Sequence, residues 1–261
     1  MDETHLRVDT DDAVGRLVID RPDAHNALDE ETAVALADAL ERLATDDAIR
    51  AVSITGRGGT YCTGADLSTL VGDEGDGERI DAIATPLHEA VRSIVGAPKP
   101  VVAGVNGVVA GGGLGLALGA DVLIVSSDAR FQYAYPNLGL SGDGGATWFL
   151  PRLIGRRRTQ RFVYFGDAID PAEAVDLGLA TEVVDADSFE ERLESVTAEL
   201  AGGPTQAFGE IKRLILEGEV TDLDDHLDAE KTVMTELTDT VDYASGLQAF
   251  LEKEAPSFEG R

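Results

Sequence analysis

The sequence predicts an α/β fold, in which short strands alternate with helices and a helical region ends the chain. Three observations lead to this prediction. Apolar stretches with strand character alternate with amphipathic stretches over the first half of the chain, as in layered α/β cores. Glycine-bearing loops directly follow two of the expected strands. From about Ser188 onward the strands disappear, and amphipathic helices run to the C-terminus.

The first expected elements are two strands at residues 6–10 and 14–20, separated by an acidic turn. Residues 28–47 place apolar side chains at helical spacing. Asp29 is a suitable N-cap for that helix, because its carboxylate can accept a free backbone N–H. A buried strand at 49–56 follows and leads into the first glycine-bearing loop.

Residues 71–81 are acidic and rich in glycine, so we expect them to be exposed and mobile. A helix at 85–95 follows and should end before the prolines of the sequence GAPKP. The next strand, 101–105, precedes the stretch 106–121, which has six glycines and contains a helix. A further strand is expected at 121–126.

The charge of the chain is strongly negative: its 261 residues include 49 Asp and Glu against 21 Lys and Arg, for a net charge of −28. Nucleic-acid binding normally needs a basic stripe, so this charge argues against a nucleic-acid partner. The acidic residues are spread along the chain rather than gathered in one tail. This spread favours a solvated surface adapted to high salt, which screens self-repulsion, over a docking surface for a cationic partner.

The sequence also bears on location and on metal binding. No stretch approaches the roughly 20 apolar residues of a membrane span, and the acidic start of the chain lacks the apolar region of a signal peptide. The only cysteine, Cys62, permits no intramolecular disulfide and excludes a cysteine-rich metal site. The four histidines are scattered without metal-ligand spacing. We therefore expect a cytoplasmic protein without a bound metal.

Three common catalytic motifs are missing from the sequence. Its glycines do not fit the dinucleotide-binding pattern G-x-G-x-x-G, and no phosphate-binding G-x-x-x-x-G-K-[ST] occurs. The stretch LGLSGDGG at 138–145 does not form the G-x-S-x-G elbow of serine hydrolases. The pair of glycine-bearing loops, YCTGADL at 61–67 and AGGGLG at 110–115, remains to be explained.

Each of these loops can present an uncovered backbone N–H near the start of a helix, where negative charge is favoured. Two such donors that converge on one point form an oxyanion hole, in which one donor is typically worth about 2.7–4 kcal/mol of transition-state stabilisation. The alternative is that the glycines only permit tight strand-to-helix turns. The two loops by themselves do not decide between these interpretations.

Four sequence blocks occur in order along the chain: RPDAHNAL at 21–28, YCTGADL at 61–67, PKPVVAGVNGVVAGGGLGLALGAD at 98–121 and GDGGATWFLPRLIG at 142–155. Together with AFLEKEAPSF at 249–258, they resemble the crotonase superfamily, the enoyl-CoA hydratase/isomerase family, over nearly the whole chain. The resemblance implies a ClpP-like spiral of strand–strand–helix units over residues 1–200. It also implies a C-terminal helical region, 201–261, through which subunits form a homotrimer or a hexamer.

The resemblance further implies an acyl-CoA thioester as the substrate and no separate cofactor, because coenzyme A is part of that substrate. It places the two oxyanion donors at the backbone N–H groups of Ala65 and Gly112. Removing or adding a proton beside a thioester carbonyl passes through an enolate, whose charge these donors would stabilise most in the transition state. One positioned acid/base must then move the proton.

The chain departs from the hydratase branch of this family at the acid/base groups. Gly115 and Tyr135 stand where hydratases carry two glutamates. Asp143 instead matches the proton-shuttling aspartate of the isomerase branch, which includes ring-epoxide isomerases. We therefore expect an isomerase that acts on a double bond or a ring epoxide, with a hydratase or a non-catalytic acyl-CoA-binding protein as the alternatives. The alternative role for Asp143 is an N-cap of the following helix.

The resemblance also suggests where the substrate is held. The main chain at Ala24 matches a contact to the adenine end of coenzyme A, and Lys253 matches a contact to its phosphate. Leu67 and Tyr135 are expected to contact the substrate. Asp66 is a further candidate contact, although the structural cap of its own loop is the favoured interpretation.

His88 has a separate possible role. Together with Asp143 it occupies the positions of the base and the nucleophile in the 4-chlorobenzoyl-CoA dehalogenase branch, where Tyr135 replaces a ring-contacting tryptophan. The stretch TWFLPR at 147–152 is isomerase-like. We therefore expect His88 to be a pocket or helix-surface residue and not a catalytic base.

Overall fold

Two β-sheets form the frame of the protein, of which the computed structural model describes residues 5–261. A six-stranded sheet has the order β1-β2-β3-β5-β7-β9, and a three-stranded sheet has the order β4-β6-β8. β1 and β2 pair antiparallel, and the other strand pairs of the described chain are parallel. The strands are β1 (Leu6–Asp11), β2 (Val14–Ile19), β3 (Ala51–Gly56), β4 (Thr60–Cys62), β5 (Val101–Val105), β6 (Val108–Ala110), β7 (Val122–Ser126), β8 (Arg130–Gln132) and β9 (Glu182–Val184).

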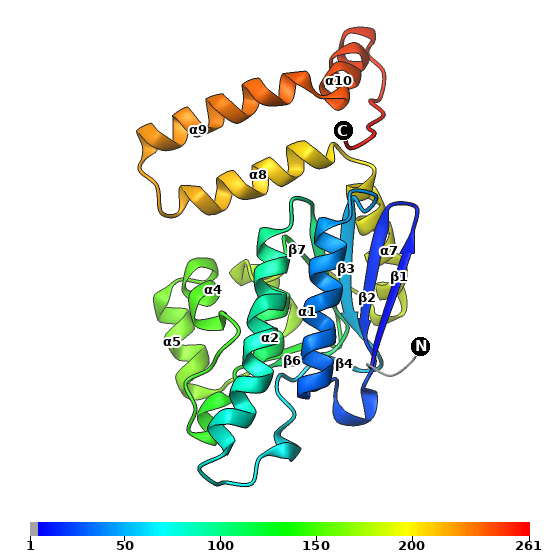
Figure 1. Cartoon of the computed structure of the whole chain (residues 1–261). Helices are drawn as coiled ribbons and strands as arrows, with labels where there is room; N and C mark the ends of the chain where they lie inside the picture. Colours follow the sequence, from blue (N-terminus) through cyan, green and yellow to red (C-terminus); the bar gives the residue numbers. More distant parts are fainter. Residues whose placement is uncertain (1–4) are drawn as a thin grey trace.

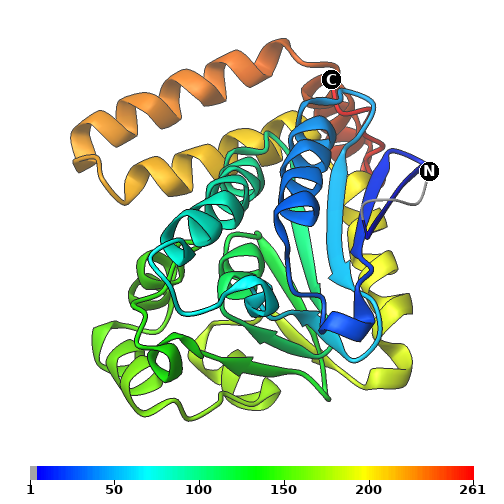
Figure 2. The same ribbon diagram turned by 60° about the horizontal axis from the view of Figure 1, so that its bottom comes forward.

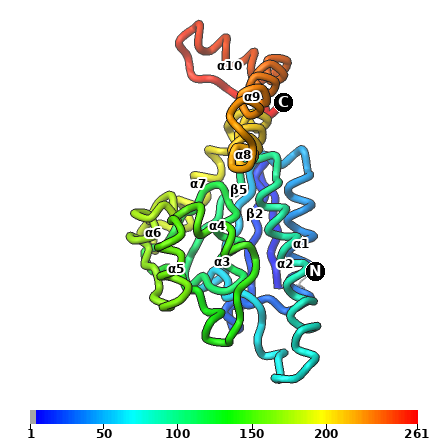
Figure 3. The backbone as a smooth tube through the Cα atoms, turned by 90° about the vertical axis from the view of Figure 1, so that its left-hand side faces the viewer, coloured from blue at the N-terminus to red at the C-terminus, as the bar shows by residue number. Residues whose placement is uncertain are grey.

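Helices cover both faces of the larger sheet. α1 and α2 lie side by side over one face, and α7 packs against β2, β3, β5 and β7 on the other (Figures 1 and 3). α3 packs against the smaller sheet and α4, and α4 packs against α5. The α-helices are α1 (Glu30–Thr45), α2 (Asp76–Gly96), α3 (Gly112–Leu118), α4 (Ala146–Leu153), α5 (Arg156–Phe165), α6 (Pro171–Leu177), α7 (Phe189–Ala201), α8 (Thr205–Gly218), α9 (Leu223–Glu236) and α10 (Val241–Glu252).

The predicted α/β fold is confirmed, and α1 shows how local sequence specifies it. The Asp29 carboxylate accepts the backbone N–H of Thr32 at 2.9 Å, so Asp29 caps the helix as predicted. Leu36, Leu40 and Leu43 follow at helical spacing and are buried on the face that meets the core. α1 therefore begins and packs where its sequence pattern indicates.

The helix expected at 85–95 begins earlier than predicted, because α2 starts at Asp76 and includes the second half of the acidic segment 71–81. The Asp76 carboxylate accepts the backbone N–H of Val71 at 3.0 Å and of Gly72 at 2.7 Å, which closes the preceding loop onto the helix. Arg79 lies 2.7 Å from the same carboxylate, one helical turn further on. These contacts depend on the loop folding back, which composition alone does not reveal.

The smaller sheet was not anticipated from the sequence. Its strands have three residues each, too few for an alternating pattern to be recognised. Because β4, β6 and β8 are parallel, the loops that follow them emerge at the same edge of the sheet. Both glycine-bearing loops are therefore brought together by this sheet.

The glycines of α3 let its neighbours approach the helix backbone. Every residue of α3 is buried. A Cβ on Gly113 would lie 2.3 Å from the carbonyl oxygen of Cys62, at the end of β4. A Cβ on Gly115 would lie 1.8 Å from the carbonyl oxygen of Gly144, in the loop before α4. Neither distance leaves room for a side chain, so glycine is required at both positions.

The last three helices form an arm beyond the core (Figures 1 and 2). Lys212 on α8 ties the arm to the core, since its buried Nζ donates to the Asp121 carboxylate at 2.8 Å and to the Ile94 carbonyl oxygen at 2.6 Å. Much of the arm's apolar surface is nevertheless exposed. The exposed apolar residues of the arm include Ile215, Val220, Leu223, Met234, Phe250 and Leu251.

Among residues 5–261, none of the helices combines the length and the apolar character that a membrane crossing needs. Over the same range, no group of three or more His, Cys, Asp and Glu side chains is placed to hold a metal ion.

Candidate active site

The loop after β4 leaves the backbone N–H of Ala65 free. Leu28 bonds to the residues on either side of Ala65: its N–H donates to the Gly64 carbonyl oxygen, and its carbonyl oxygen accepts the N–H of Asp66, both at 2.8 Å. In this parallel pairing the N–H of Ala65 points away from Leu28. No acceptor in the described part of the chain takes it.

The loop after β6 exposes a second N–H, that of Gly112. α3 begins at Gly112, so this N–H is one that a helix cannot satisfy internally, and no acceptor among residues 5–261 takes it. The two loops touch, because a Cβ on Gly64 would lie 2.6 Å from the Gly112 nitrogen. Gly64 also has a φ of +88°, which disfavours any residue with a side chain. The free N–H groups of Ala65 and Gly112 thus come from two loops in contact.

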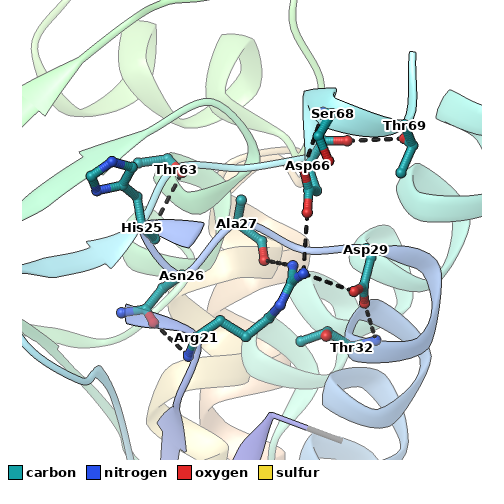
Figure 4. A network of polar contacts seen from close by, with 10 residues as sticks. All are labelled: Arg21, His25, Asn26, Ala27, Asp29, Thr32, Thr63, Asp66, Ser68 and Thr69. Atoms are coloured by element: carbon teal, nitrogen blue, oxygen red, sulfur yellow. Dashed lines mark hydrogen bonds and ion pairs between the residues drawn. The ribbon is translucent and has the colours of Figure 1, made fainter. Parts of the chain in front are cut away.

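Arg21 fastens the first of these loops to the start of α1 (Figure 4). Its Nη2 lies 3.0 Å from the Asp29 carboxylate and 3.1 Å from the Asp66 carboxylate, and its Nη1 donates to the Ala27 carbonyl oxygen. Asp66 also accepts the N–H and the hydroxyl of Ser68. The hydrogen bond from Ser68 and the Arg21 guanidinium hold the pKa of Asp66 below its usual range. Asp66 therefore caps its own loop as an ionised carboxylate.

Asn26 joins the same region to β4. Its side chain is fully buried and donates to the carbonyl oxygens of Thr60 at 2.6 Å and Arg57 at 3.0 Å. Its Oδ1 accepts the backbone N–H of Arg21 at 2.8 Å. Neither Arg21 nor Asn26 was expected to position the site, because the sequence signals them only by their place in the block RPDAHNAL.

The loop before α4 brings Asp143 to the same place. A Cβ on Gly112 would lie 3.6 Å from Asp143 Oδ1. α4 begins at Ala146 with Gly145 as its N-cap residue, and the N–H of Ala146 bonds to the main-chain oxygen of Asp143 at 3.3 Å. The Asp143 side chain does not cap this helix, so the alternative role considered for it is wrong. Its carboxylate lies beside Gly112 instead.

Two tyrosines pack around the Asp143 loop. The Tyr135 hydroxyl donates to Asp143 Oδ1, and the Tyr133 hydroxyl donates to the Ser141 carbonyl oxygen at 2.5 Å. The two ring centroids lie 5.1 Å apart. Burial and the negative charge of Asp143 raise the pKa of both phenols above the usual value, so both hydroxyls remain protonated donors. The hydroxyl of Tyr135, a residue expected to contact the substrate, is thus directed to the carboxylate.

His88 reaches the same loop from α2. Its Nε2 accepts the backbone N–H of Gly144 at 3.2 Å and lies 3.8 Å from Asp143 Oδ2. At 3.8 Å the contact with Asp143 is too long for a hydrogen bond, and Nε2 faces the Gly144 N–H instead. Because Nε2 is already occupied, His88 fixes the backbone at Gly144 and does not present this nitrogen to a water molecule.

The other residues that were expected to contact the substrate lie in different parts of the structure. Ala24 ends a 3₁₀ turn at Pro22–Ala24, and Leu67 begins a second one at Leu67–Thr69, next to the Ala65 loop. Lys253 is the C-cap residue of α10 on the arm, which lies apart from α3 and α4 (Figure 3). Within one chain Lys253 therefore does not join the other site residues.

Comparison with known proteins places the chain among acyl-CoA enzymes. Residues 9–261 match the family model described as enoyl-CoA hydratase/isomerase. The chain is 36% identical over 250 residues to 1,2-epoxyphenylacetyl-CoA isomerase of Escherichia coli (strain K12), covering 94% of each. It is also 36% identical over 258 residues to a Rhodobacter capsulatus protein named "Probable enoyl-CoA hydratase", covering 98% of each. The crystal structure of enoyl-CoA hydratase from Bacillus anthracis superposes with a TM-score of 0.92 at 29% identity, covering 98% of this chain and all of that one.

Proposed function

The chain belongs to the enoyl-CoA hydratase/isomerase family, and from that premise we propose that it is an enoyl-CoA isomerase in which Asp143 carries the proton. The observation that supports this most strongly is the position of the Asp143 carboxylate beside Gly112, which carries one of the two free N–H groups. Positions 115 and 135, by contrast, hold Gly and Tyr, which cannot activate water as a pair of glutamates would. One carboxylate beside an oxyanion hole suits proton transfer between two carbons of the substrate.

In the proposed reaction the N–H groups of Ala65 and Gly112 bind the thioester oxygen of a 3-enoyl-CoA. Asp143 takes a proton from carbon 2, and the electron pair left behind forms a dienolate whose charge on oxygen these donors stabilise. Carbon 4 then takes the proton back from Asp143, which leaves the double bond between carbons 2 and 3. The thioester carbonyl is restored, the aspartate is ionised again, and no atom is gained or lost. A thioester that carries a ring epoxide is the second substrate class that we propose for this site.

The remaining substrate contacts are proposals of the same kind. We assign the main chain at Ala24 to the adenine end of coenzyme A and place the acyl chain along Leu67 and the ring of Tyr135. Since α10 lies apart from the site of its own chain, Lys253 would meet a phosphate of coenzyme A bound to another copy in a homotrimer or hexamer. Exposed apolar residues on the arm are consistent with such an assembly, which light scattering tests directly.

Substitution of Asp143 by Asn tests the proposed function. Asn keeps the size of the side chain and can still accept the Tyr135 hydroxyl, so the free energy of unfolding and the affinity for acyl-CoA should change little. Isomerisation of a 3-enoyl thioester should fall about 10²–10⁴-fold, the usual contribution of a positioned acid/base. The assay incubates the enzyme with 2-enoyl and 3-enoyl thioesters in heavy water at high salt and identifies the products by mass.

Each alternative gives a different result in that assay. A hydratase adds water to the 2-enoyl thioester and leaves the 3-enoyl thioester unchanged. A non-catalytic member binds acyl-CoA tightly and turns over neither compound. Full isomerase activity of Asp143→Asn would assign the proton transfer to another group.

A further inference from the structure

We propose that Tyr135 is a positioning residue, whose hydroxyl holds Oδ1 of Asp143 so that Oδ2 is the oxygen that carries the proton. This inference rests on the proposed function, because it names the atom through which the same carboxylate acts. It starts from the hydrogen bond that the Tyr135 hydroxyl donates to Oδ1. Tyr135 is partly buried and packs against the main hydrophobic core, so its ring is a fixed support.

The loop that carries Asp143 needs such a support, because its backbone is built largely from glycine. The glycines of this loop with positive φ are Gly139 (+71°), Gly142 (+104°), Gly144 (+62°) and Gly145 (+83°). Glycine loses more conformational freedom on folding than any other residue, so contacts from outside the loop must fix it. The two tyrosines supply them: a Cβ on Gly142 would lie 2.0 Å from the Tyr133 hydroxyl and 3.2 Å from Cδ2 of Tyr135.

The two tyrosines have different targets. The Tyr133 hydroxyl binds the Ser141 carbonyl oxygen and therefore fixes the backbone of the loop. The Tyr135 hydroxyl binds the carboxylate itself. One tyrosine thus acts on the position of the loop, and the other acts on the group that reacts.

The second carboxylate oxygen is left without a donor among the described residues. His88 Nε2 lies 3.8 Å from Oδ2 and already accepts the Gly144 N–H, so it does not donate to Oδ2. No Lys or Arg nitrogen lies within 4.0 Å of the carboxylate over residues 5–261. The ionisable groups that face Asp143 are therefore Tyr135 and Tyr133 from the segment after β8 and His88 from α2. Oδ2 is thus the carboxylate oxygen that accepts no hydrogen bond among the described residues, and the inference assigns the transferred proton to it.

The hydrogen bond to Oδ1 fixes the direction in which the carboxylate faces. Tyr135→Phe removes this donor and lets the carboxylate rotate away from the substrate. A misplaced acid/base slows the proton transfer without weakening substrate binding, so kcat should fall about tenfold while KM changes little.

The test compares wild type, Tyr135→Phe, Tyr133→Phe and Asp143→Asn in the isomerisation of a 3-enoyl thioester, with kcat and KM measured separately. Tyr133→Phe is the matched control, because it removes the same hydroxyl from the neighbouring ring but leaves the carboxylate bonded. We expect a lower kcat at an unchanged KM for Tyr135→Phe and a smaller loss of kcat for Tyr133→Phe. Circular dichroism checks that each variant is folded.

Three outcomes would overturn the inference. If Asp143→Asn is inactive while Tyr135→Phe keeps the kcat of wild type, the positioning role is wrong and the proposed function stands. If both tyrosine variants lose kcat equally, the hydroxyls only stabilise the loop. If Asp143→Asn keeps its activity, the proposed function falls and the role of Tyr135 falls with it.

Discussion

Replacing Gly64 by Ala should disable the proposed oxyanion hole without touching any group that carries charge. The added Cβ would lie 2.6 Å from the Gly112 nitrogen, whereas ordinary contact begins near 3.4 Å. The difference of 3.4 − 2.6 = 0.8 Å must come from movement of one loop or the other. A misplacement on the order of 1 Å in an active site can lower the rate about 10²-fold, and we expect a loss of that size in kcat.

The same substitution also affects stability, which requires a control. Gly64 has a φ of +88°, and a left-handed conformation costs a residue with a side chain roughly 1–2 kcal/mol. Gly166 follows α5 with a φ of +71°, and a Cβ there would meet nothing within 4 Å. Gly166→Ala should therefore lose only the stability that the left-handed backbone conformation costs, with no steric clash added. Urea unfolding should show destabilisation in both variants, with the larger loss for Gly64→Ala.

The assay is turnover of whichever enoyl thioester the wild type accepts, measured for both variants in parallel. Gly166→Ala should retain the kcat of wild type, and Gly64→Ala should fall well below it. If folded Gly64→Ala turns over within a few-fold of the Gly166→Ala control, the contact between the two loops does not position the oxyanion donors.

Two further predictions concern the second donor and the surface charge. Gly112→Pro removes the N–H outright and should abolish turnover. The free energy of unfolding should fall by only about 1–3 kcal/mol, because proline is tolerated in the first turn of a helix. The added Cβ would clash only with the flexible end of the Leu87 side chain. Near-normal activity in a folded Gly112→Pro variant would remove Gly112 from the oxyanion hole. With a net charge of −28, the protein should lose thermal stability and affinity for the polyanionic coenzyme A below roughly 0.1 M salt, where the Debye length reaches about 10 Å. A salt series of Tm and KM checks this, and flat curves would show that the acidic surface has no such role.

The sequence predicted correctly those elements whose start and packing depend on a few neighbouring residues. Asp29 caps α1 because a carboxylate precedes an apolar helical repeat, and both signals lie within a few residues. The start of α2 was misjudged because it depends on Asp76 accepting N–H groups from the loop before it. The smaller sheet was missed because its three-residue strands are stabilised by pairing with one another and not by their own pattern.

The site shows the same division between local and long-range information. The glycine loops at 61–67 and 110–115 were visible in the sequence because glycine itself is the signal. The hydrogen bond from the Tyr135 hydroxyl to Asp143 joins residues eight positions apart across a folded loop, and no sequence pattern predicts such a contact. Likewise, the N-cap role considered for Asp143 was reasonable from its position, but Gly145 takes that place in the folded loop.

The contact between Gly115 and Gly144 limits how this scaffold can evolve. Installing a glutamate at position 115, where the hydratase branch carries one, would place its Cβ 1.8 Å from the Gly144 carbonyl oxygen. The loop would have to move to make room, and that loop also carries Asp143. A mutational path toward water addition would therefore displace the carboxylate that we propose to be catalytic before a glutamate at position 115 could work. Directed evolution for hydration should recover changes in residues 142–145 before, or together with, any change at Gly115.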